Sequence, residues 1–379
     1  MKIVIAPDSY KESLSALDVA CAIEDGFREI FPDAQYVKLP VADGGEGTVE
    51  AMVAATQGRV VDVEVTGPLG SPVRGFYGIS GDNRCAFIEM AAASGLESVP
   101  VAQRNPLKTT SWGTGELIRH ALECGVSRII IGLGGSATND GGAGMVQALG
   151  ARLLTASGQP IAPGGAGLET LATIDISGLD SRLSRCQIDV ACDVTNPLTG
   201  EEGASAVFGP QKGATPEMVA FLDRALAHYA GCIQRDLGRD VLKLEGGGAA
   251  GGMGAALHAF CGAALRPGIE IVTDALHLDA LVADASLVIT GEGRMDSQTI
   301  HGKVPVGVAK VAKRYRIPVI GIAGSLTPDV GVVHQHGIDA VFSVIYRICT
   351  LEEALSEAGE NVRMAARNIA AVIKLGQTL

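Results

Sequence analysis

The chain has 379 residues, the length of two domains or of one elaborated domain, and either is long enough to bury a hydrophobic core. Apolar residues make up 47% and charged residues 19%, which excludes wholesale disorder, and no apolar stretch approaches the roughly 20 residues that cross a bilayer. The formal net charge of −12, without a basic run, would repel nucleic acid over most of the surface. A local cluster of Lys, Arg and helix N-termini can still bind a small anion on such a protein.

The eight cysteines contain no C-x-x-C pair, which indicates neither a disulfide framework nor a zinc site. The apolar start Met1–Ile5 runs almost directly into Asp8 and is too short for a secretory segment. We therefore expect a cytoplasmic protein with a small-molecule substrate, no nucleic-acid partner and no membrane partner. Assembly into a homo-oligomer is left open.

The predicted elements alternate between short β-branched strands and helices. In chain order they are strand Lys2–Ala6, helix Leu14–Phe31, strand Gln35–Pro40, helix Gly47–Thr56, strand Arg128–Leu133, helix Ala143–Leu149, strand Ser286–Thr290, helix Val304–Tyr315, strands Pro318–Ala323 and Ala340–Val344, and a final helix from about Leu351 to Lys374. Alternation of this kind is typical of a parallel sheet with helices on both faces.

Two stretches interrupt this alternation. Residues Val60–Met90 resemble strands joined by turns, and Ala151–Glu270 contain short strands, one helix near Pro216–Leu237 and a glycine-rich stretch. We interpret them as one smaller domain, residues 60–100 plus 151–275, inserted into a larger α/β domain of residues 1–59 plus 101–150 plus 276–379. The cleft between the two is then the expected site.

The 50 glycines gather in clusters, which indicates sharp turns or close approaches of backbone to ligand. Four loops, starting at Asp8, Asp43, Gly134 and Gly291, follow predicted strands. In parallel sheets ligands bind beyond the carboxyl ends of the strands, so these loops are the candidate binding loops.

Gly132–Ala137 matches the dinucleotide pattern G-x-G-x-x-A after a strand. The acidic residue that this pattern requires roughly 20 positions later is missing, so NAD binding is poorly supported. The polar segment Thr138–Gly144 follows instead. Its backbone N–H groups suit a phosphate, and Asn139 or Asp140 suits a metal or a hydroxyl, although an elaborate turn explains such a loop as well.

The remaining loops pair acids with cations. Asp8 and Lys11 follow the first strand, Asp43 and Glu46 follow the second, Asp193 precedes Lys212, and Glu292 precedes Arg294. Each loop has a plain alternative as a helix cap or a solvated turn. Together they supply what phosphoryl transfer needs: carboxylates for metal ions and for proton abstraction, and cations for the transferring group. Neither a P-loop nor a protein-kinase catalytic loop is present.

In order along the chain, these segments resemble the type I glycerate kinase family of bacteria. The resemblance covers the whole length and is carried by 6–11 (APDSYK), 42–48 (ADGGEGT), 89–96 (EMAAASGL), 113–118 (GTGELI), 134–142 (GGSATNDGG), 192–198 (CDVTNPL), 207–213 (VFGPQKG), 248–252 (GAAGG) and 291–293 (GEG).

The resemblance implies ATP- and Mg²⁺-dependent phosphorylation of D-glycerate on its 2-hydroxyl, and a flavodoxin-like α/β domain interrupted by a smaller swivelling β/β/α domain. Within it we assign Asp193 as the base, and Lys11, Lys212 or Arg294 as the cations that hold the glycerate carboxylate or the γ-phosphate. We further assign the ATP phosphates to Gly134, Gly135, Ser136, Asn139, Gly141, Gly291, Glu292 and Gly293, the substrate to Ser9, Asp43 and Asn196, and Mg²⁺ to Asp8, Glu46 and Asp140.

Two other classes of protein remain as alternatives. An NAD-dependent oxidoreductase rests on the G-x-G-x-x-A match alone. A non-catalytic protein that binds a sugar acid would need the anion-binding groups but not the surplus of carboxylates.

Overall fold

The computed structural model describes residues 1–378, which form two compact units. The first unit comprises residues 1–43, 50–57 and 268–379, and the second comprises 44–49 and 58–267. The chain leaves the first unit briefly at residues 44–49, returns for residues 50–57 and then leaves again for residues 58–267, so the second unit is inserted into the first. The insertion is the larger of the two, which corrects the expected smaller inserted domain.

The first unit is built on a parallel five-stranded sheet in the order β13-β12-β11-β1-β2. Counted within the unit, this order is 2-1-3-4-5, the order of flavodoxin-like doubly wound sheets. Its elements are β1 (Lys2–Ile5), α1 (Ala16–Arg28), β2 (Gln35–Lys38), α2 (Thr48–Thr56), α9 (Gly268–Ala275), α10 (Leu278–Val282), β11 (Leu287–Met295), α11 (Val304–Arg314), β12 (Val319–Leu326), β13 (Ala340–Ser343), α12 (Leu351–Ser356) and α13 (Ala358–Gly376).

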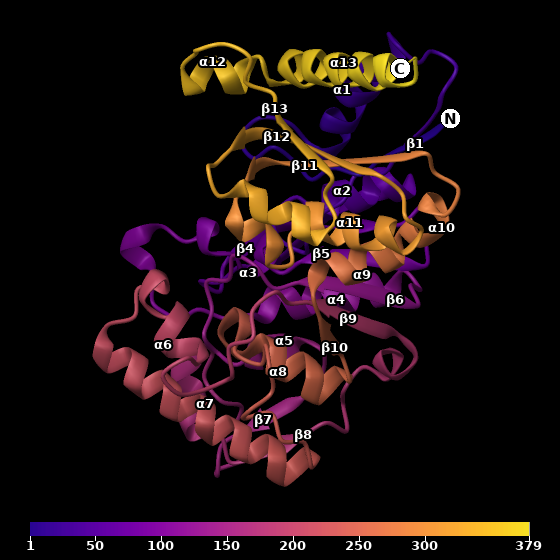
Figure 1. Ribbon diagram of the computed structural model, residues 1–379. Helices are drawn as coiled ribbons and strands as arrows, with labels where there is room; N and C mark the ends of the chain where they lie inside the picture. The colour runs from indigo at the N-terminus through magenta and orange to yellow at the C-terminus, as the bar shows by residue number, and fades with distance from the viewer. Residues whose placement is uncertain (379) are drawn as a thin grey trace. The chain divides into compact units, whose positions relative to one another are not determined.

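Helices cover both faces of this sheet (Figure 1). Helices α1 and α13 lie side by side on one face, where Ile3, Phe27 and Ile369 belong to one buried cluster. Helix α11 packs on the other face against β11 and β12. Burial on both faces explains why the central strand β1 is a continuous apolar run rather than an alternating one.

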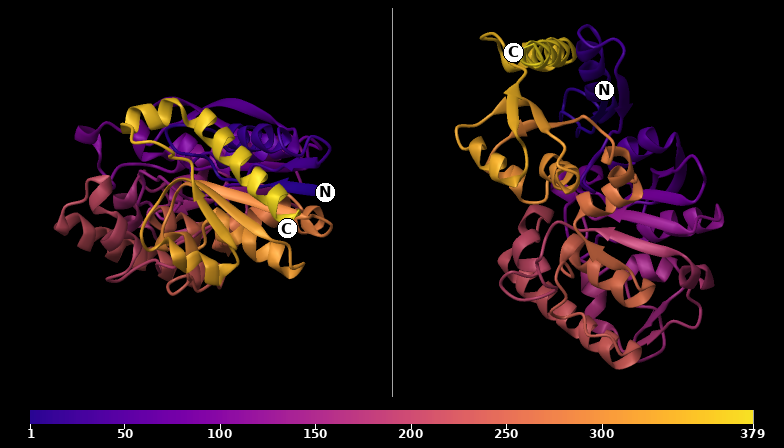
Figure 2. Two further views of the ribbon diagram at one scale, coloured as in Figure 1. Left: turned by 45° about the horizontal axis from the view of Figure 1, so that its top comes forward. Right: turned by 45° about the vertical axis from the view of Figure 1, so that its right-hand side comes forward.

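The predicted final helix is in fact two helices. Glu357 leaves the helical conformation with φ −99° and ψ 12° and separates α12 from α13. The path of α13 is set by its packing on α1, since a Cβ at Gly26 of α1 would lie 2.3 Å from the carbonyl oxygen of Arg363. Figure 2 shows the yellow helix α13 beside the sheet from two further directions.

The second unit contains a six-stranded sheet in the order β10-β9-β6-β5-β4-β3 and a hairpin of β7 and β8. Strands β5, β6, β9 and β10 run parallel, and β3, β4 and β5 form an antiparallel meander. The elements are β3 (Arg59–Thr66), β4 (Pro72–Ile79), β5 (Cys85–Glu89), α3 (Ala91–Ser94), α4 (Trp112–Glu123), β6 (Arg128–Gly132), α5 (Ala143–Ala148), β7 (Arg152–Leu154), β8 (Thr173–Asp175), β9 (Gln187–Ala191), α6 (Ala204–Phe208), α7 (Pro216–Leu237), α8 (Ala249–Cys261) and β10 (Ala264–Arg266).

The assignment of residues 101–150 to the first unit was wrong. Strand β6 lies between β5 and β9 in the second sheet, and α4 and α5 pack within the second unit. A strand followed by a helix has the same local pattern in either sheet, and only the long-range pairing of β6 decides which sheet it joins. No helix within residues 1–378 has the length and apolar character required to cross a membrane.

Candidate active site

The carboxyl ends of β1 and β11 form the topological switch point of the first sheet. These two strands are neighbours, and the chain leaves them in different directions along the sheet, which is where doubly wound sheets bind ligands. The loop after β1 is tied to β11 because the backbone N–H of Asp8 donates to the carbonyl of Gly291 at 2.8 Å. Two of the four predicted loops are thereby brought together.

Three carboxylates interact at this edge. Burial raises the pKa of Asp8 to about 7, and the nearby charges of Asp43 and Glu292 add to the shift. The N–H of Ser9 donates to Asp8 Oδ1 at 2.7 Å and favours the charged form, but it does not cancel the other two effects. Such a concentration of negative charge is relieved by a cation.

Magnesium fits this edge of the sheet. Mg²⁺ is commonly held by one or two carboxylates, with waters and substrate phosphates completing its shell. Within residues 1–378 no three His, Cys, Asp or Glu side chains are grouped as a ready-made metal cage. Asp8, with Asp43 and Glu292 close enough to shift its pKa, therefore matches a magnesium that arrives with a nucleotide rather than one held by protein alone.

Glu292 is held in place by two residues that the sequence assignment omitted. The Thr299 hydroxyl donates to Oε1 at 2.6 Å, and the Lys303 ammonium lies 3.8 Å from Oε2. Burial nevertheless raises the pKa of Glu292. Thr299 is also part of a capping box with Asp296, and the D-x-x-T spacing was a readable signal for it.

The cations of the first unit are exposed. Lys11 follows β1 next to Gly293, since a Cβ built on Gly293 would lie 3.6 Å from the backbone nitrogen of Lys11. Arg294, which lies on β11, directs its guanidinium to Asp296 at 3.3 Å. Lys11 is thus placed beside the predicted phosphate loop, whereas Arg294 is engaged by its own strand end.

In the second unit, the predicted glycine loop of residues 134–142 follows β6 and leads into α5. Gly134 and Gly135 are exposed, and the residues from Ser136 to Gly142 are buried. Gly135 and Gly141 have φ of 72° and 63°, a conformation that favours glycine. Only the start of the loop therefore presents backbone to a ligand.

Asp140 lies at the centre of this loop and holds it together. Its Oδ2 accepts from the N–H and hydroxyl of Ser111 at 2.9 and 2.8 Å and from the Gly144 N–H at 3.2 Å, and its Oδ1 accepts from the Gly142 N–H at 3.1 Å. Burial raises the pKa of Asp140 despite these donors. A carboxylate so fully engaged stabilises the loop and the start of α5, and this geometry favours a structural role over the predicted metal role.

Lys212 is buried beneath the same loop. Its ammonium donates to the Ser136 hydroxyl at 2.8 Å and to the Thr138 carbonyl at 2.6 Å. Burial lowers the pKa of Lys212 to about 7, which the charge of Asp140 only partly opposes. These contacts favour a positioning role in which Lys212 fixes the loop backbone over the predicted direct contact with glycerate or the γ-phosphate.

Asn139 has one satisfied and one unsatisfied amide atom. Its Nδ2 donates to the Ser205 hydroxyl at 3.0 Å, while its Oδ1 and the Thr138 hydroxyl are buried without a hydrogen-bond partner among the described residues. Asn139 thus supports the loop from within the second unit.

Asp193 and Asn196 follow β9, the neighbour of β6, and so lie at the same edge of the second sheet as the glycine loop. Asp193 is exposed, and the Asn196 side chain donates to the Glu202 carbonyl at 2.8 Å. Glu46 is exposed in the segment 44–49. Glu89, which the assignment omitted, anchors that segment by accepting from the Val49 N–H at 2.8 Å.

Comparisons with known proteins place this arrangement in a family. The sequence pattern of the Glycerate kinase family matches residues 3–374. The chain belongs to the glycerate kinase family. The predicted resemblance is thus confirmed, and with it an enzyme that phosphorylates glycerate. The family match favours this enzyme over the oxidoreductase and the non-catalytic binding protein.

The relatives match over nearly their whole length. The glycerate 2-kinase of Escherichia coli K12 is 68% identical over 99% of both chains, and the glycerate kinase of Bacillus subtilis 168 is 60% identical over 100% of this chain and 99% of its own. The crystal structure of a Salmonella typhimurium LT2 protein provisionally named glycerate kinase 2 has a TM-score of 0.94 and 77% identity, with full coverage of both chains.

Proposed function

We propose that this glycerate kinase transfers the γ-phosphoryl group of ATP to the 2-hydroxyl of D-glycerate and requires Mg²⁺. The observation that carries the proposal is the group of coupled carboxylates Asp8, Asp43 and Glu292 at the switch point of the first sheet, next to the exposed Lys11. The 68% identity to a protein named glycerate 2-kinase supports the choice of the 2-hydroxyl.

The first unit would bind the metal and the phosphates. Asp8 holds Mg²⁺, directly or through water, and Mg²⁺ when bound neutralises charge on the phosphate oxygens. Lys11 and the backbone at Gly291 and Gly293 bind phosphate oxygens, while Thr299 and Lys303 keep Glu292 in place. Asp43 and Ser9 contact the ligand from the same edge, and Arg294 contributes charge.

The second unit would supply the acceptor chemistry. Asp193 is exposed at a strand end and accepts the proton of the attacking hydroxyl, as a carboxylate does in other phosphoryl transfers. Gly134 and Gly135 present N–H groups to an anion, and Lys212 and Asp140 fix the loop behind them. Asn196 and Glu46 remain assigned to substrate and metal contacts.

Phosphorus NMR of the purified protein with ATP, MgCl₂ and D-glycerate tests the proposal. The expected result is a 2-phosphoglycerate signal that falls by roughly 100-fold or more in Asp193→Asn, because general-base catalysis contributes about that much. A 3-phosphoglycerate signal would overturn the regiochemistry, and an equally active variant would remove Asp193 from its role. Asp62→Asn is the matched control, because Asp62 is an exposed carboxylate of β3 that pairs with Arg74.

A further inference from the structure

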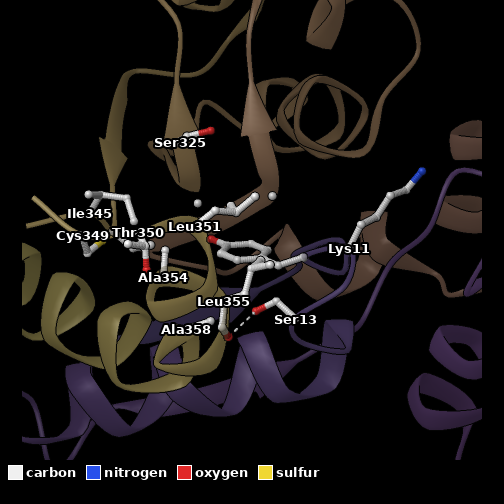
Figure 3. A pocket seen from close by; sticks show the side chains of 14 residues that line it. Lys11, Ser13, Ser325, Ile345, Cys349, Thr350, Leu351, Ala354, Leu355 and Ala358 are labelled. Atoms are coloured by element: carbon white, nitrogen blue, oxygen red, sulfur yellow. Dashed lines mark hydrogen bonds between the residues drawn. The ribbon is translucent and has the colours of Figure 1, made fainter.

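A cavity of about 290 Å³ opens in the first unit beside Lys11. Its walls come from the loop after β1, the carboxyl-end segments of β11, β12 and β13, and helix α12, as Figure 3 shows. The cavity therefore lies on the same edge of the sheet as the switch point and extends from β1 and β11 toward β13. Of its lining residues, only Lys11 and Gly293 have a role in the function proposed above.

The lining of the cavity is mostly apolar. Ile345, which follows β13, lines it together with Leu351, Ala354 and Leu355 of α12 and Ala358, the first residue of α13. Tyr10 also lines the cavity, and its hydroxyl donates to the Ile322 carbonyl at 2.8 Å. Two of the apolar residues at the rim are left in solvent, with Leu351 74% and Ile345 40% exposed. A rim of this kind is typical of a ligand site whose occupant covers it.

The apolar lining suits one of the two substrates of a kinase, the nucleotide, better than the other, glycerate. Glycerate is a small anion with two hydroxyls and would leave this apolar cavity largely unfilled. A nucleoside offers a flat apolar ring and a ribose. The cavity volume of about 290 Å³ is close to the lower limit for small-molecule pockets, which is about 300 Å³. The aliphatic hydroxyl side chains of Ser13, Ser325 and Thr350 also line the cavity.

The direction of Lys11 connects the cavity with the phosphate loop. Lys11 is part of the cavity wall, yet its side chain extends away from the apolar residues and its ammonium is exposed (Figure 3). Gly293, which also lines the cavity, follows Glu292 on β11, in the segment that was predicted as a phosphate loop. A ligand whose apolar end fills the cavity would therefore carry its charged end past Gly293 and Lys11.

We propose that this cavity binds the adenosine moiety of ATP, with the phosphates running past Gly293 toward Lys11. The inference rests on the proposed function, because it assumes that ATP is the phosphoryl donor. It adds the nucleoside site, to which Tyr10, Ile345, Cys349, Leu351 and Ala354 contribute.

A steady-state comparison of two tryptophan variants tests the site. Ala354→Trp fills the cavity, and the expected result is at least about a tenfold increase in KM for ATP with KM for D-glycerate within about twofold of wild type. Val372→Trp is the matched control, because Val372 is exposed and lines a separate cavity of about 260 Å³. Equal KM values for ATP in wild type and in folded Ala354→Trp would overturn the inference while leaving the kinase intact.

Alkylation of Cys349 tests the same site without reference to activity. Cys349 is a half-buried free thiol that lines the cavity, and Cys124 is an exposed free thiol in the second unit. Peptide mass spectrometry after N-ethylmaleimide treatment should show Cys349 protected severalfold by ATP or ADP, with Cys124 unchanged. Unchanged labelling of Cys349 at saturating nucleotide would overturn the inference, and protection in a protein that forms no phosphoglycerate would overturn only the proposed reaction.

Discussion

At the level of the single residue, Asp8 is the carboxylate of the switch point whose ionised form is most strongly disfavoured. Burial and the charges of Asp43 and Glu292 disfavour its ionised form, and a bound cation would remove that penalty. A ligand that binds only the folded protein stabilises it by mass action.

Magnesium alone should therefore raise the melting temperature of the wild-type protein, relative to NaCl at equal ionic strength. Asp8→Asn should abolish most of this increase because it removes the charge that attracts the ion. Scanning fluorimetry measures both. An equal magnesium effect in the variant would exclude Asp8 as the metal ligand, and Asp25→Asn, on exposed helix surface, is the control.

The lowered pKa of Lys212 predicts how the free energy of unfolding depends on pH. In the unfolded chain it keeps its proton up to its ordinary pKa of 10.5, whereas burial brings its pKa in the folded protein to about 7. Between these values the unfolded state binds more protons, so Lys212 contributes a free energy of unfolding that rises with pH, by about 1.4 kcal/mol per pH unit at most. Lys212→Met should lose this rise.

Urea unfolding at pH 7 and pH 9 measures the difference. We expect Lys212→Met to have a smaller gain in the free energy of unfolding over this interval than wild type, and Lys310→Met, at an exposed lysine, to behave like wild type. Identical pH dependence in all three proteins would show that Lys212 titrates normally in the folded state.

At the level of the single element, strand β11 needs a glycine at position 291 for space rather than for backbone conformation. A Cβ at Gly291 would lie 1.8 Å from the carbonyl oxygen of Ile322 on β12, whereas a Cβ at Gly293 would lie 3.5 Å from its nearest neighbour, the Cα of Tyr10. The two glycines are two residues apart on one strand and differ only in what they face.

Gly291→Ala should destabilise the first unit by about 3 kcal/mol, since the β11–β12 pairing must shift to relieve the overlap. Gly293→Ala should cost less than about 1 kcal/mol. Midpoints of urea unfolding, followed by circular dichroism, give the comparison. Equal midpoints for the two variants would contradict the packing explanation.

At the scale of the whole molecule, each unit has its own hydrophobic core. The cluster around Phe27 contains residues of the first unit only, and the cluster around Ile131 contains residues of the second unit only. Loss of a buried Phe side chain costs roughly 3–5 kcal/mol and acts on the core that contains it.

Phe27→Ala should therefore accelerate amide hydrogen exchange in peptides of β1, α1 and α13 and leave β6 and β9 protected. Ile131→Ala should have the reverse effect. Mass spectrometry of the exchanged peptides separates the two patterns. Acceleration throughout the chain in both variants would show that the two cores unfold as one.

Local signals along the chain were enough to predict most helices and strands and the kinds of side chain in the loops. Helix α7 was predicted near Pro216–Leu237 and has these bounds, and its ends carry local signals in the N-cap Thr215, the first-turn Pro216 and the left-handed Gly238. The glycine and acidic loops were found for the same reason, and their order along the chain indicated the glycerate kinase family.

The combination of these parts depends on contacts between residues that are distant in sequence. Strand β6 belongs to the second sheet because it pairs with β5 and β9. These partners are distant in sequence, and pairing between distant strands leaves no trace in a local pattern. Asp8 and Asp140 looked alike in sequence, yet Asp8 faces other carboxylates and Asp140 is surrounded by four donors. The physical reason is the same in both cases: pairing and burial are properties of neighbours in space, and they set the role of a strand or the pKa of a side chain.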